Sequence, residues 1–365
     1  MEFKDSSSVH LQVRQILAGY PNFSLVESED GYQRWKKMEE QVELLPIQYQ
    51  KELVDYQKLY FKERTDYVEE ISMLLKSGSK DIGIWPVFLI HMNGQWKCST
   101  CGGEVMEPLF DKNFNLTVKT KRKIYKAALQ LIMDLSKELH ITRLDFTETL
   151  VDGNVSLWHR FLMENGACIY KVTHMAYYDV MLDKQRAMKM MHRTTAQQIK
   201  KGYEFYRYEI ITANSKDIDW KMEQFRDFHT KVSGRETRGK QTWEKQADGI
   251  KKNRDFAVFQ YDKETGELDG ASLFTATHSH CYYSVAVYNR DKFERPIGHM
   301  AQDVAMNYLR ELGIRWYIVG DRFYKSDGVD RKNLSISEYK EAFATSYYLK
   351  VCLALDLYQG KGSDS

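Results

Sequence analysis

The sequence predicts an α/β protein with mixed sheets, built from two similar modules that follow one another along the chain. Shifting the chain by 173 positions aligns Ile124 with Ile297 and Ala128 with Ala301, within the apolar stripes of two amphipathic helices. Each helix leads directly into a stretch with strand composition. The helices are expected at 121–139 and 297–312, and the strands that follow them at 142–146 and 315–319. A helix, its exit and the next strand are repeated together, which indicates a duplicated unit.

The order of the other predicted elements supports the same division. Asn93-Gly94 is a two-residue hairpin signal, and the turn-rich segment 263–267 joins two strands in the second half. Both halves therefore begin with hairpins and continue through alternating helices and strands, an order that does not make a doubly wound parallel sheet. The remaining strands are expected at 82–92, 95–99, 168–182, 256–261, 268–277, 282–288 and 347–357, and the remaining helices at 31–43, 47–77 (interrupted near 65–66), 156–164, 217–232, 243–252 and 335–343.

The composition is that of a soluble globular protein with room for two cores. Of the 365 residues, 43% are hydrophobic and 28% are charged. The formal net charge is +2, so no overall field directs the protein to nucleic acid or to an anionic membrane. No stretch approaches the roughly 20 apolar residues of a membrane span, and residues 1–8 lack the apolar core of a signal peptide. We therefore expect a cytoplasmic protein without a membrane span.

The predicted elements divide the chain into five parts. The first 45 residues are polar and are expected to be peripheral, and a basic amphipathic stretch connects the two modules. The last residues have the composition of a disordered tail. The parts are a peripheral segment 1–45, a first module 46–182, a connector 183–203, a second module 204–358 with the main active site, and a tail 359–365.

The five cysteines favour reduced thiols, because an odd number does not fit a disulfide framework. Cys98 and Cys101 have CxxC spacing, but a structural zinc site needs four ligands and the other cysteines stand alone. A redox CxxC is expected at the start of a helix, whereas Gly102-Gly103 follow here. We expect no metal and interpret the pair as incidental thiols of a loop, with a metal or redox role as the alternative.

Several segments resemble the FemAB-type transferases, the superfamily of peptidoglycan-bridge aminoacyltransferases. The β-β-β-α-β-α-β order is similar to that of a GCN5-related N-acetyltransferase (GNAT) module, and two such modules in one chain resemble this superfamily. The similar segments are the inter-module link at 178–182 and 190–202, and the marks of a subgroup linked with surface polysaccharides at 228–238 with Trp243, 271–274, 282–283 and 288–299. The resemblance covers roughly residues 45–357 and implies two tandem GNAT-like acyltransferase modules.

The resemblance also implies a function. We expect an N-acyl- or aminoacyltransferase that acts on an amino group of a cell-surface glycan or nucleotide-sugar precursor. Aminoacyl-tRNA is the donor of FemAB-type enzymes and acyl-CoA that of ordinary GNAT modules; both stay open as co-substrates, and no tightly bound cofactor is expected. The alternatives are a coenzyme-A-dependent amino-sugar N-acetyltransferase and a non-catalytic module that binds an acidic glycan.

Three residues of the second module are candidates for the chemistry. Acyl transfer to an amine needs aligned substrates and donors to the oxyanion, and a general base assists it. His299 is either a base, since imidazole titrates near neutrality, or a packing residue at a helix start. Asp321, directly after a strand and Gly320, is either a catalytic group or a turn residue. Tyr283 either donates to the oxyanion or packs.

Arginines supply the candidate acceptor site. Arg235 and Arg238 share a loop and offer bidentate recognition of carboxylate or phosphate, which predicts an anionic acceptor; a solvated basic loop is the alternative. The predicted substrate-binding residues are Arg235, Arg238, Trp243, Tyr282, Arg290 and Arg322.

The candidate donor site combines a helix start with two lysines. Arg295 and Gly298 match part of the GNAT motif that holds pyrophosphate at a helix N-terminus, although Met300 stands where a small residue is expected. An ordinary helix start is the alternative. Lys200 and Lys201, on the basic connector, predict contact with tRNA phosphates.

Overall fold

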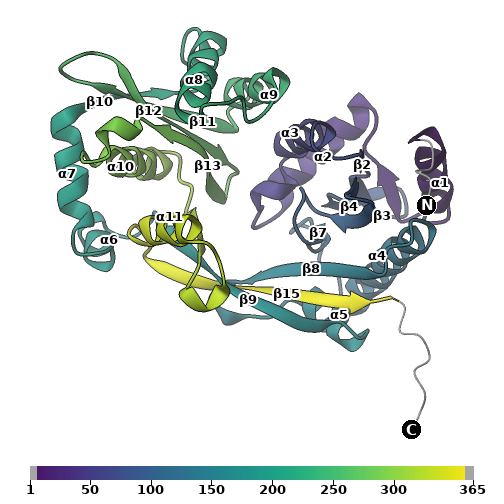
Figure 1. The fold of residues 1–365 in the computed structure, drawn as a ribbon. Helices are drawn as coiled ribbons and strands as arrows, with labels where there is room; N and C mark the ends of the chain where they lie inside the picture. The colour runs from purple at the N-terminus through teal and green to yellow at the C-terminus, as the bar shows by residue number, and fades with distance from the viewer. Residues whose placement is uncertain (1–5, 358–365) are drawn as a thin grey trace. The chain divides into compact units, whose positions relative to one another are not determined.

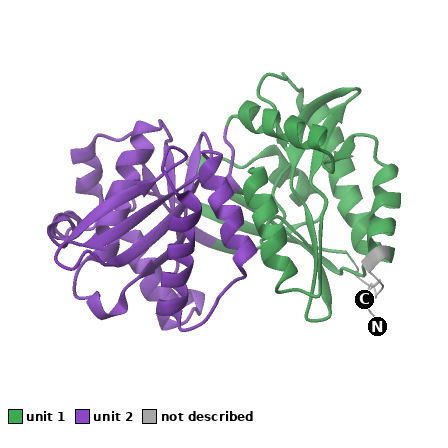
Figure 2. Ribbon diagram, turned by 90° about the horizontal axis from the view of Figure 1, so that it is seen from above, with its two compact units in different colours: residues 1–43, 48–172, 349–365 green, residues 44–47, 173–348 purple. Residues whose placement is uncertain are grey.

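The computed structural model describes residues 6–357. The chain divides into two compact units (Figure 2), unit 1 with residues 1–43, 48–172 and 349–365 and unit 2 with residues 44–47 and 173–348. Each unit has its own hydrophobic core. Two strands, β9 (Cys168–Asp179) and β15 (Ser346–Asp356), run along the chain from one unit into the other.

Unit 1 is built from two antiparallel sheets, with strand orders β1-β3-β4-β7 and β2-β5-β6 (Figure 1). A further strand, β8, pairs antiparallel with β15 from Leu150↔Leu349 to Arg143↔Asp356. The helices are α1 (Ser6–Ala18), α2 (Glu29–Gln41), α3 (Lys51–Lys62), α4 (Val118–Glu138) and α5 (Leu157–Glu164). The strands are β1 (Phe23–Leu25), β2 (Tyr67–Glu70), β3 (Met73–Ser77), β4 (Lys80–Trp85), β5 (Phe88–Met92), β6 (Gln95–Ser99), β7 (Leu109–Phe110) and β8 (Arg143–Leu150).

Unit 2 is one mixed sheet with strand order β10-β11-β12-β13-β14-β9, covered by helices on both faces. Neighbouring strands are antiparallel except β13 and β14, which are parallel. Phe256 and Val258 pack with α7 and α10, while Ala257 and Phe259 face α8 and α9, as the strand period of two requires. The helices are α6 (Lys184–Met190), α7 (Thr195–Phe205), α8 (Ile218–Ser233), α9 (Lys240–Lys251), α10 (Ile297–Glu311) and α11 (Arg331–Glu341). The strands are β10 (Tyr206–Ile211), β11 (Asp255–Asp262), β12 (Leu268–Ala276), β13 (His280–Tyr288) and β14 (Trp316–Arg322).

The structure confirms the predicted α/β class with mixed sheets. The aligned helices are α4 and α10, and both bury the shared stripe, with Ala128 and Ala301 fully enclosed. Each helix is followed by a strand, β8 and β14, and then by a second helix, α5 and α11. The apolar stripe predicts both helices correctly, because it is the face of each helix that contacts the core.

Two predicted elements of unit 1 differ from the structure. The helix expected at 47–77 ends with α3 at Lys62, where Thr65 donates through Oγ1 to the carbonyl of Phe61 (2.6 Å), and two strands, β2 and β3, follow. Met73, at the start of β3, is fully buried, and a short buried run reads equally well as helix or strand. The strand expected at 82–92 is interrupted at Pro86, which has no N–H for a ladder, so its halves join different sheets.

The units also differ from the predicted parts of the chain. The segment 1–45 is not peripheral, because Val9, Val13 and Trp35 are almost fully buried in unit 1. The connector 183–203 forms α6 and α7, which belong to unit 2. The boundary lies inside β9 rather than after 182, and the end of β15 returns to unit 1 because it pairs with β8. The tail predicted at 359–365 lies outside the described residues.

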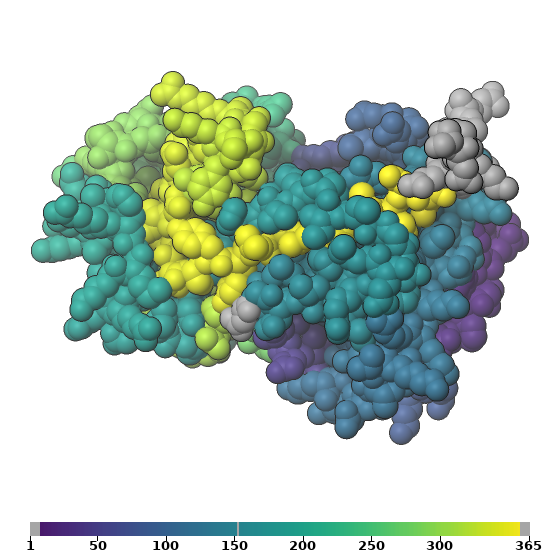
Figure 3. Space-filling view, turned by 90° about the horizontal axis from the view of Figure 1, so that it is seen from below, coloured from purple at the N-terminus to yellow at the C-terminus, as the bar shows by residue number. Residues whose placement is uncertain are grey.

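Two features of the surface complete the description. β15, in the yellow part of the chain in Figure 3, carries Tyr347 and Leu349, which are 46% and 41% exposed. Within residues 6–357, every helix falls short of the length and apolar character that a bilayer crossing requires. The prediction missed α1, β1, β7 and β10, which are short or lack a strong periodic pattern.

Candidate active site

In unit 2, β13 and β14 run parallel over three residue pairs and then separate. Their last paired residues are Tyr282 and Ile318. Beyond this pair β13 continues to Tyr288 and β14 to Arg322 without pairing to each other. Ligands of α/β proteins bind where neighbouring parallel strands part at their carboxyl ends. We therefore take this separation point as the candidate active site.

A network of tyrosines fills the interior of the separation point. The hydroxyl of Tyr288 lies 2.8 Å from those of Tyr283 and Ser272, and Tyr317 donates to Gln302. Burial raises the pKa of Tyr283 well above its usual value, with a further contribution from Tyr288. Tyr283 therefore stays neutral and already hydrogen-bonded, so the structure places it in a packed network rather than at an open oxyanion site.

The start of α10 is enclosed on three sides. A Cβ atom on Gly298 would collide with the hydroxyl of Tyr339, which comes from α11. Gly202 of α7 packs so closely that a Cβ there would lie 3.0 Å from that of Met300. Gln260 of β11 donates through Nε2 to the carbonyl of Ile297 (2.5 Å). A pyrophosphate needs the free backbone N–H groups of a helix start, and the glycine at this position serves helix packing instead.

His299 is a packing residue in this structure. Its ring lies edge-on to Tyr339, with centroids 5.3 Å apart, and 5.4 Å from Phe343. Burial lowers the pKa of His299 to about 4. The imidazole is thus neutral near pH 7 and a weak proton acceptor, which does not suit a general base.

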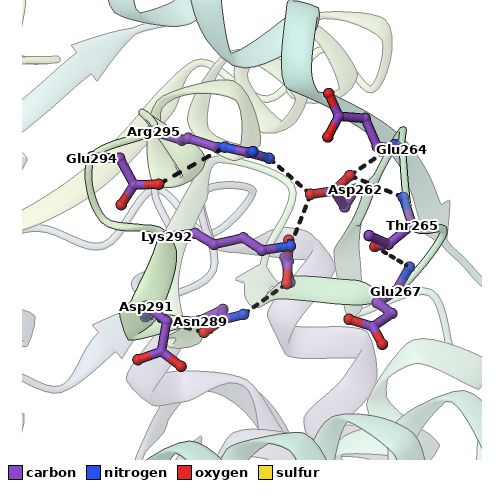
Figure 4. A network of polar contacts seen from close by, with 10 residues as sticks. Asp262, Glu264, Thr265, Glu267, Asn289, Asp291, Lys292, Glu294 and Arg295 are labelled. Carbon is purple, nitrogen blue, oxygen red and sulfur yellow. Dashed lines mark hydrogen bonds and ion pairs between the residues drawn. The ribbon is translucent and has the colours of Figure 1, made fainter.

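The loop before α10 is fastened to the β11–β12 hairpin by buried ion pairs (Figure 4). Lys292 donates to Asp262 (2.8 Å) and Asp269 (2.6 Å), and Arg295 donates to Asp262 (2.8 Å). Both carboxylates are 1% exposed. Hydrogen bonds from Lys292 hold the pKa of Asp262 well below its usual value. Arg295 therefore stabilises the fold through its ion pair with Asp262, which corrects its expected role in donor binding.

The side-chain amine of Lys340 lies beside Gly320 of β14, two residues beyond the last residue of that strand that pairs with β13. Gly320 has a φ of +139°, and a Cβ atom there would lie 2.7 Å from Nζ of Lys340 on α11. Burial lowers the pKa of Lys340, and the charge of Asp321 opposes this shift. Among residues 6–357, no side-chain hydrogen bond or ion pair engages the amine of Lys340. Burial, with help from Asp321, raises the pKa of Tyr282 to about 12. The structure thus brings Lys340, Asp321 and Tyr282 together.

Lys340 has no signature in the sequence. It stands in the predicted helix 335–343, where a lysine is ordinary. The sequence marks this site only by Gly320-Asp321 after a strand. That pattern predicts a role for Asp321 but gives no indication of Lys340. Contact between residues of α11 and β14 depends on tertiary packing.

The two predicted arginines have different surroundings. Arg235 is exposed. Arg238 is 7% exposed and stacks on the ring of Trp243 at 3.7 Å, and Trp243 belongs to the core under α8 and α9. A buried, stacked guanidinium and a core indole stabilise the fold, which corrects the roles expected for Arg238 and Trp243. Arg235 stays a prediction.

The other predicted binding residues separate into engaged and exposed side chains. Arg322 donates to Glu341 (2.6 Å) and to the carbonyl of Phe323, and it lies over Tyr324, so it is held within the fold. Arg290 is exposed on the loop before α10. Lys200 and Lys201 are exposed on α7. The three exposed cations remain available to an anionic substrate.

The cysteines show no metal geometry within residues 6–357. No group of three or more His, Cys, Asp or Glu side chains in this range is arranged to hold an ion. Cys98 is buried, and burial raises the pKa of its thiol to about 12. Burial also raises the pKa of Cys101. Both thiols are therefore protonated and unreactive near neutral pH.

Comparison with known proteins adds the fold family. No protein-family model and no curated protein matches the sequence. Among solved structures, FemX is similar with a TM-score of 0.57 at 10% identity, over 82% of this chain and 95% of that chain. The C-terminal domain of a putative lysylphosphatidylglycerol synthetase from Agrobacterium fabrum is similar with a TM-score of 0.58 at 13% identity, over 87% and 90%.

A third structure, L-PGS from Bacillus licheniformis, is similar with a TM-score of 0.51 at 11% identity, over 84% of this chain and 91% of that chain. At these identities the likeness concerns the fold. It extends over most of both chains and therefore includes both modules. The chain has the FemX-like fold over most of its length.

Proposed function

We propose that this protein is an aminoacyltransferase that moves an aminoacyl group from aminoacyl-tRNA to the amino group of an anionic glycan or nucleotide-sugar precursor. The observation that carries the proposal is the amine of Lys340 over Gly320, beside Asp321. Acyl transfer to an amine passes through a tetrahedral oxyanion, and a partly buried cation without another partner is suited to stabilise it.

The proposed reaction uses two groups of unit 2. The acceptor nitrogen attacks the ester carbonyl, a C–N bond forms, and the carbonyl oxygen becomes an oxyanion that accepts a hydrogen bond from Nζ of Lys340. The tetrahedral intermediate then breaks its bond to the ribose oxygen, which leaves as a hydroxyl. Asp321 accepts the proton released by the amine, and this proton returns to the leaving ribose oxygen. Asp321 also favours the charged form of Lys340.

Two observations favour aminoacyl-tRNA over acyl-CoA as the donor. The start of α10 is enclosed by Gly202, Gln260 and Tyr339, so it offers little room to a pyrophosphate. Lys200 and Lys201 are exposed on α7 and suit the phosphates of an RNA. The similar structures include a putative synthetase named for lysylphosphatidylglycerol, an aminoacylated product, which agrees with this choice.

The acceptor is the less defined substrate. Arg235 and Arg290 are exposed arginines of unit 2 and suit a phosphate or carboxylate. We therefore propose an anionic amino sugar, free or nucleotide-linked, of the kind used for cell-surface glycans. A coenzyme-A-dependent amino-sugar N-acetyltransferase is the alternative that the experiment has to separate.

The test compares two labelled donors. The purified protein is incubated with a panel of amino-sugar nucleotides and either tRNA charged with labelled amino acids or labelled acetyl-CoA. We expect a labelled amide product with charged tRNA and none with acetyl-CoA. Transfer from acetyl-CoA alone would contradict the donor, and glycan binding without transfer from either donor would contradict an enzyme.

A further inference from the structure

One face of α4 in unit 1 carries a row of lysines. Lys119, Lys123 and Lys126 are spaced by four and three residues, so their side chains follow one another along the same side of the helix. All three are exposed. The buried residues of α4, among them Ile124 and Ala128, lie on the opposite side and hold the helix to the core. The lysine stripe, defined as Lys119, Lys123 and Lys126, therefore faces solvent.

The charge of the lysine stripe is not compensated by its surroundings. Within residues 6–357, no ion pair or side-chain hydrogen bond engages any of its three amines. Glu164 of α5 is bound by Arg122 (2.6 and 2.7 Å), and Asp134 of α4 accepts a hydrogen bond from Gln130 (2.8 Å). In the loop before α4, Asp111 is 4% exposed. The helix α1, which packs on α4, contains no acid between its first and last residues. The stripe is therefore a locally positive surface.

The position of these lysines opposes the helix dipole. The first turns of a helix favour acids, because its N-terminus carries a partial positive charge. The helix α2 follows this rule with Glu29 and Asp30 in its first turn, whereas α4 has no acid there. Like charges at a spacing of four residues also repel each other. The stripe thus lowers the stability of α4, and a local rule broken without a structural gain indicates a function.

We propose that the lysine stripe binds the phosphate backbone of a duplex RNA. Lys119 and Lys126 are about 10 Å apart along the helix axis, which matches about three steps of one strand of a duplex. The exposed positions between them carry no aromatic ring on which a base could stack, so the stripe contacts phosphates and does not read the sequence.

Two points favour RNA over a membrane surface. This inference rests on the proposed use of aminoacyl-tRNA, which is a linear polyanion with paired arms, and a single row of lysines suits a linear partner. Binding to a bilayer also requires apolar area that enters the interface. In the first turn of α4, Val118 is the exposed apolar side chain (61%), and one valine supplies little such area.

The test measures the binding of a fluorescein-labelled RNA hairpin to the full chain over a range of salt concentrations. Lys119→Gln combined with Lys123→Gln should weaken binding at low salt about tenfold or more. The slope of log Kd against log salt should fall by about 1.8, since each phosphate contact contributes about 0.9. Lys119→Arg combined with Lys123→Arg should keep the affinity, because the charge is retained. Hairpins of unrelated sequence should bind alike.

The matched control is Lys37→Gln combined with Lys62→Gln, which removes the same charge from exposed positions of α2 and α3 in unit 1. It should leave RNA binding almost unchanged. Circular dichroism should show that the stripe variant is folded and no less stable, since unfavourable charges leave the helix start. Equal weakening by the control, unchanged binding by the stripe variant, or preference for phosphatidylglycerol vesicles over the hairpin would overturn the inference.

The same experiment separates this inference from the proposed function. Transfer from charged tRNA, together with unchanged hairpin binding by the stripe variant, overturns this inference alone. Hairpin binding that depends on the stripe, without any transfer, supports the inference and contradicts the proposed function.

Discussion

The two units follow the same order of helices and strands. At the corresponding place in each unit, however, the polar residues differ in their chemistry. In unit 1, Val105 forms a parallel bridge with Phe146 of β8, and two residues beyond it stand Glu107 and Glu148. In unit 2, β13 and β14 part after Tyr282 and Ile318, and tyrosines fill the space. A helix that buries the duplicated stripe precedes β8 and β14 alike. The duplication kept the apolar positions and changed the polar ones.

The acidic point of unit 1 is surrounded by aromatic side chains. The rings of Trp158 and Tyr125 lie 5.0 Å apart, and both residues are buried. Burial raises the pKa of Glu107 to about 8, with a further contribution from the charge of Glu148. Glu148 in turn lies 2.8 Å from Nδ1 of His159. The amine of Lys340 lies over Gly320 in unit 2, and for this reason we propose that unit 2 carries the transfer chemistry.

The loops that lead into the paired helices differ as well. α4 begins after Thr117, whose hydroxyl accepts a hydrogen bond from the N–H of Thr120 (3.2 Å) at an exposed site. α10 begins after the loop that Lys292 and Arg295 fasten to buried carboxylates. An ordinary cap is sufficient for a helix whose start is solvated, whereas a buried loop needs its charges paired.

The largest expected effect concerns Lys340 of unit 2. Lys340→Met should lower kcat by two to three orders of magnitude, because removal of one oxyanion donor typically costs about that much. KM for charged tRNA should change little. Lys332→Met, at an exposed position of the same helix, is the control and should keep full activity. Equal activity of the two variants would remove Lys340 from the mechanism.

The next effect concerns the fastened loop. Lys292→Met leaves Asp269 buried without its cation and Asp262 with Arg295 alone, so we expect a loss of about 3 kcal/mol in the free energy of unfolding. Urea titration monitored by circular dichroism measures it. Lys123→Met, exposed on the first turns of α4, should change the stability by less than about 0.5 kcal/mol. A loss of similar size in both variants would show that the two loops do not differ.

The neighbouring carboxyl groups of Glu107 and Glu148 in unit 1 predict that the stability of the protein depends on pH. A carboxyl whose pKa rises on folding stabilises the protein below its ordinary pKa of about 4.3, and this contribution is lost as pH rises through 8. Glu107→Gln cannot ionise and avoids the loss. We expect equal stability of variant and wild type at pH 4, and a gain for the variant that grows by about 4 kcal/mol between pH 5 and pH 8.5, because each pH unit between the two pKa values is worth about 1.4 kcal/mol. A difference that does not change with pH would contradict a buried acid.

The smallest effect concerns the cap of α4. Thr117→Ala removes one hydrogen bond to a backbone N–H at a solvated helix start, which should cost about 1 kcal/mol. Thr117→Ser keeps the acceptor and should restore most of the stability. Thermal unfolding followed at 222 nm compares the two variants. A loss as large as that of Lys292→Met would mean that the start of α4 is more than a simple cap.

Prediction from the sequence succeeded where the pattern is local and periodic. The stripes of α4 and α10 and the Asn93-Gly94 hairpin are where they were expected. The prediction failed for β3, which is a short buried run. It also failed at Pro86, whose missing N–H matters only because the flanking residues pair in different sheets. The stacking of Arg238 on Trp243 and the ion pairs of Arg295 follow from tertiary packing, so chemistry inferred from residue type alone overestimated both arginines.

The sequence by itself determined the tandem modules and their class, because hydrophobic periodicity specifies which face of each helix and strand is buried. It also singled out Asp321 after Gly320. Only the tertiary structure decided that Lys340 lies over that glycine and that Tyr339 covers the start of α10. It likewise decided that Glu107 and Glu148 each lie two residues beyond the bridge between Val105 and Phe146 in unit 1. These neighbours come from elements far apart in the chain, and only the packing of those elements brings them together.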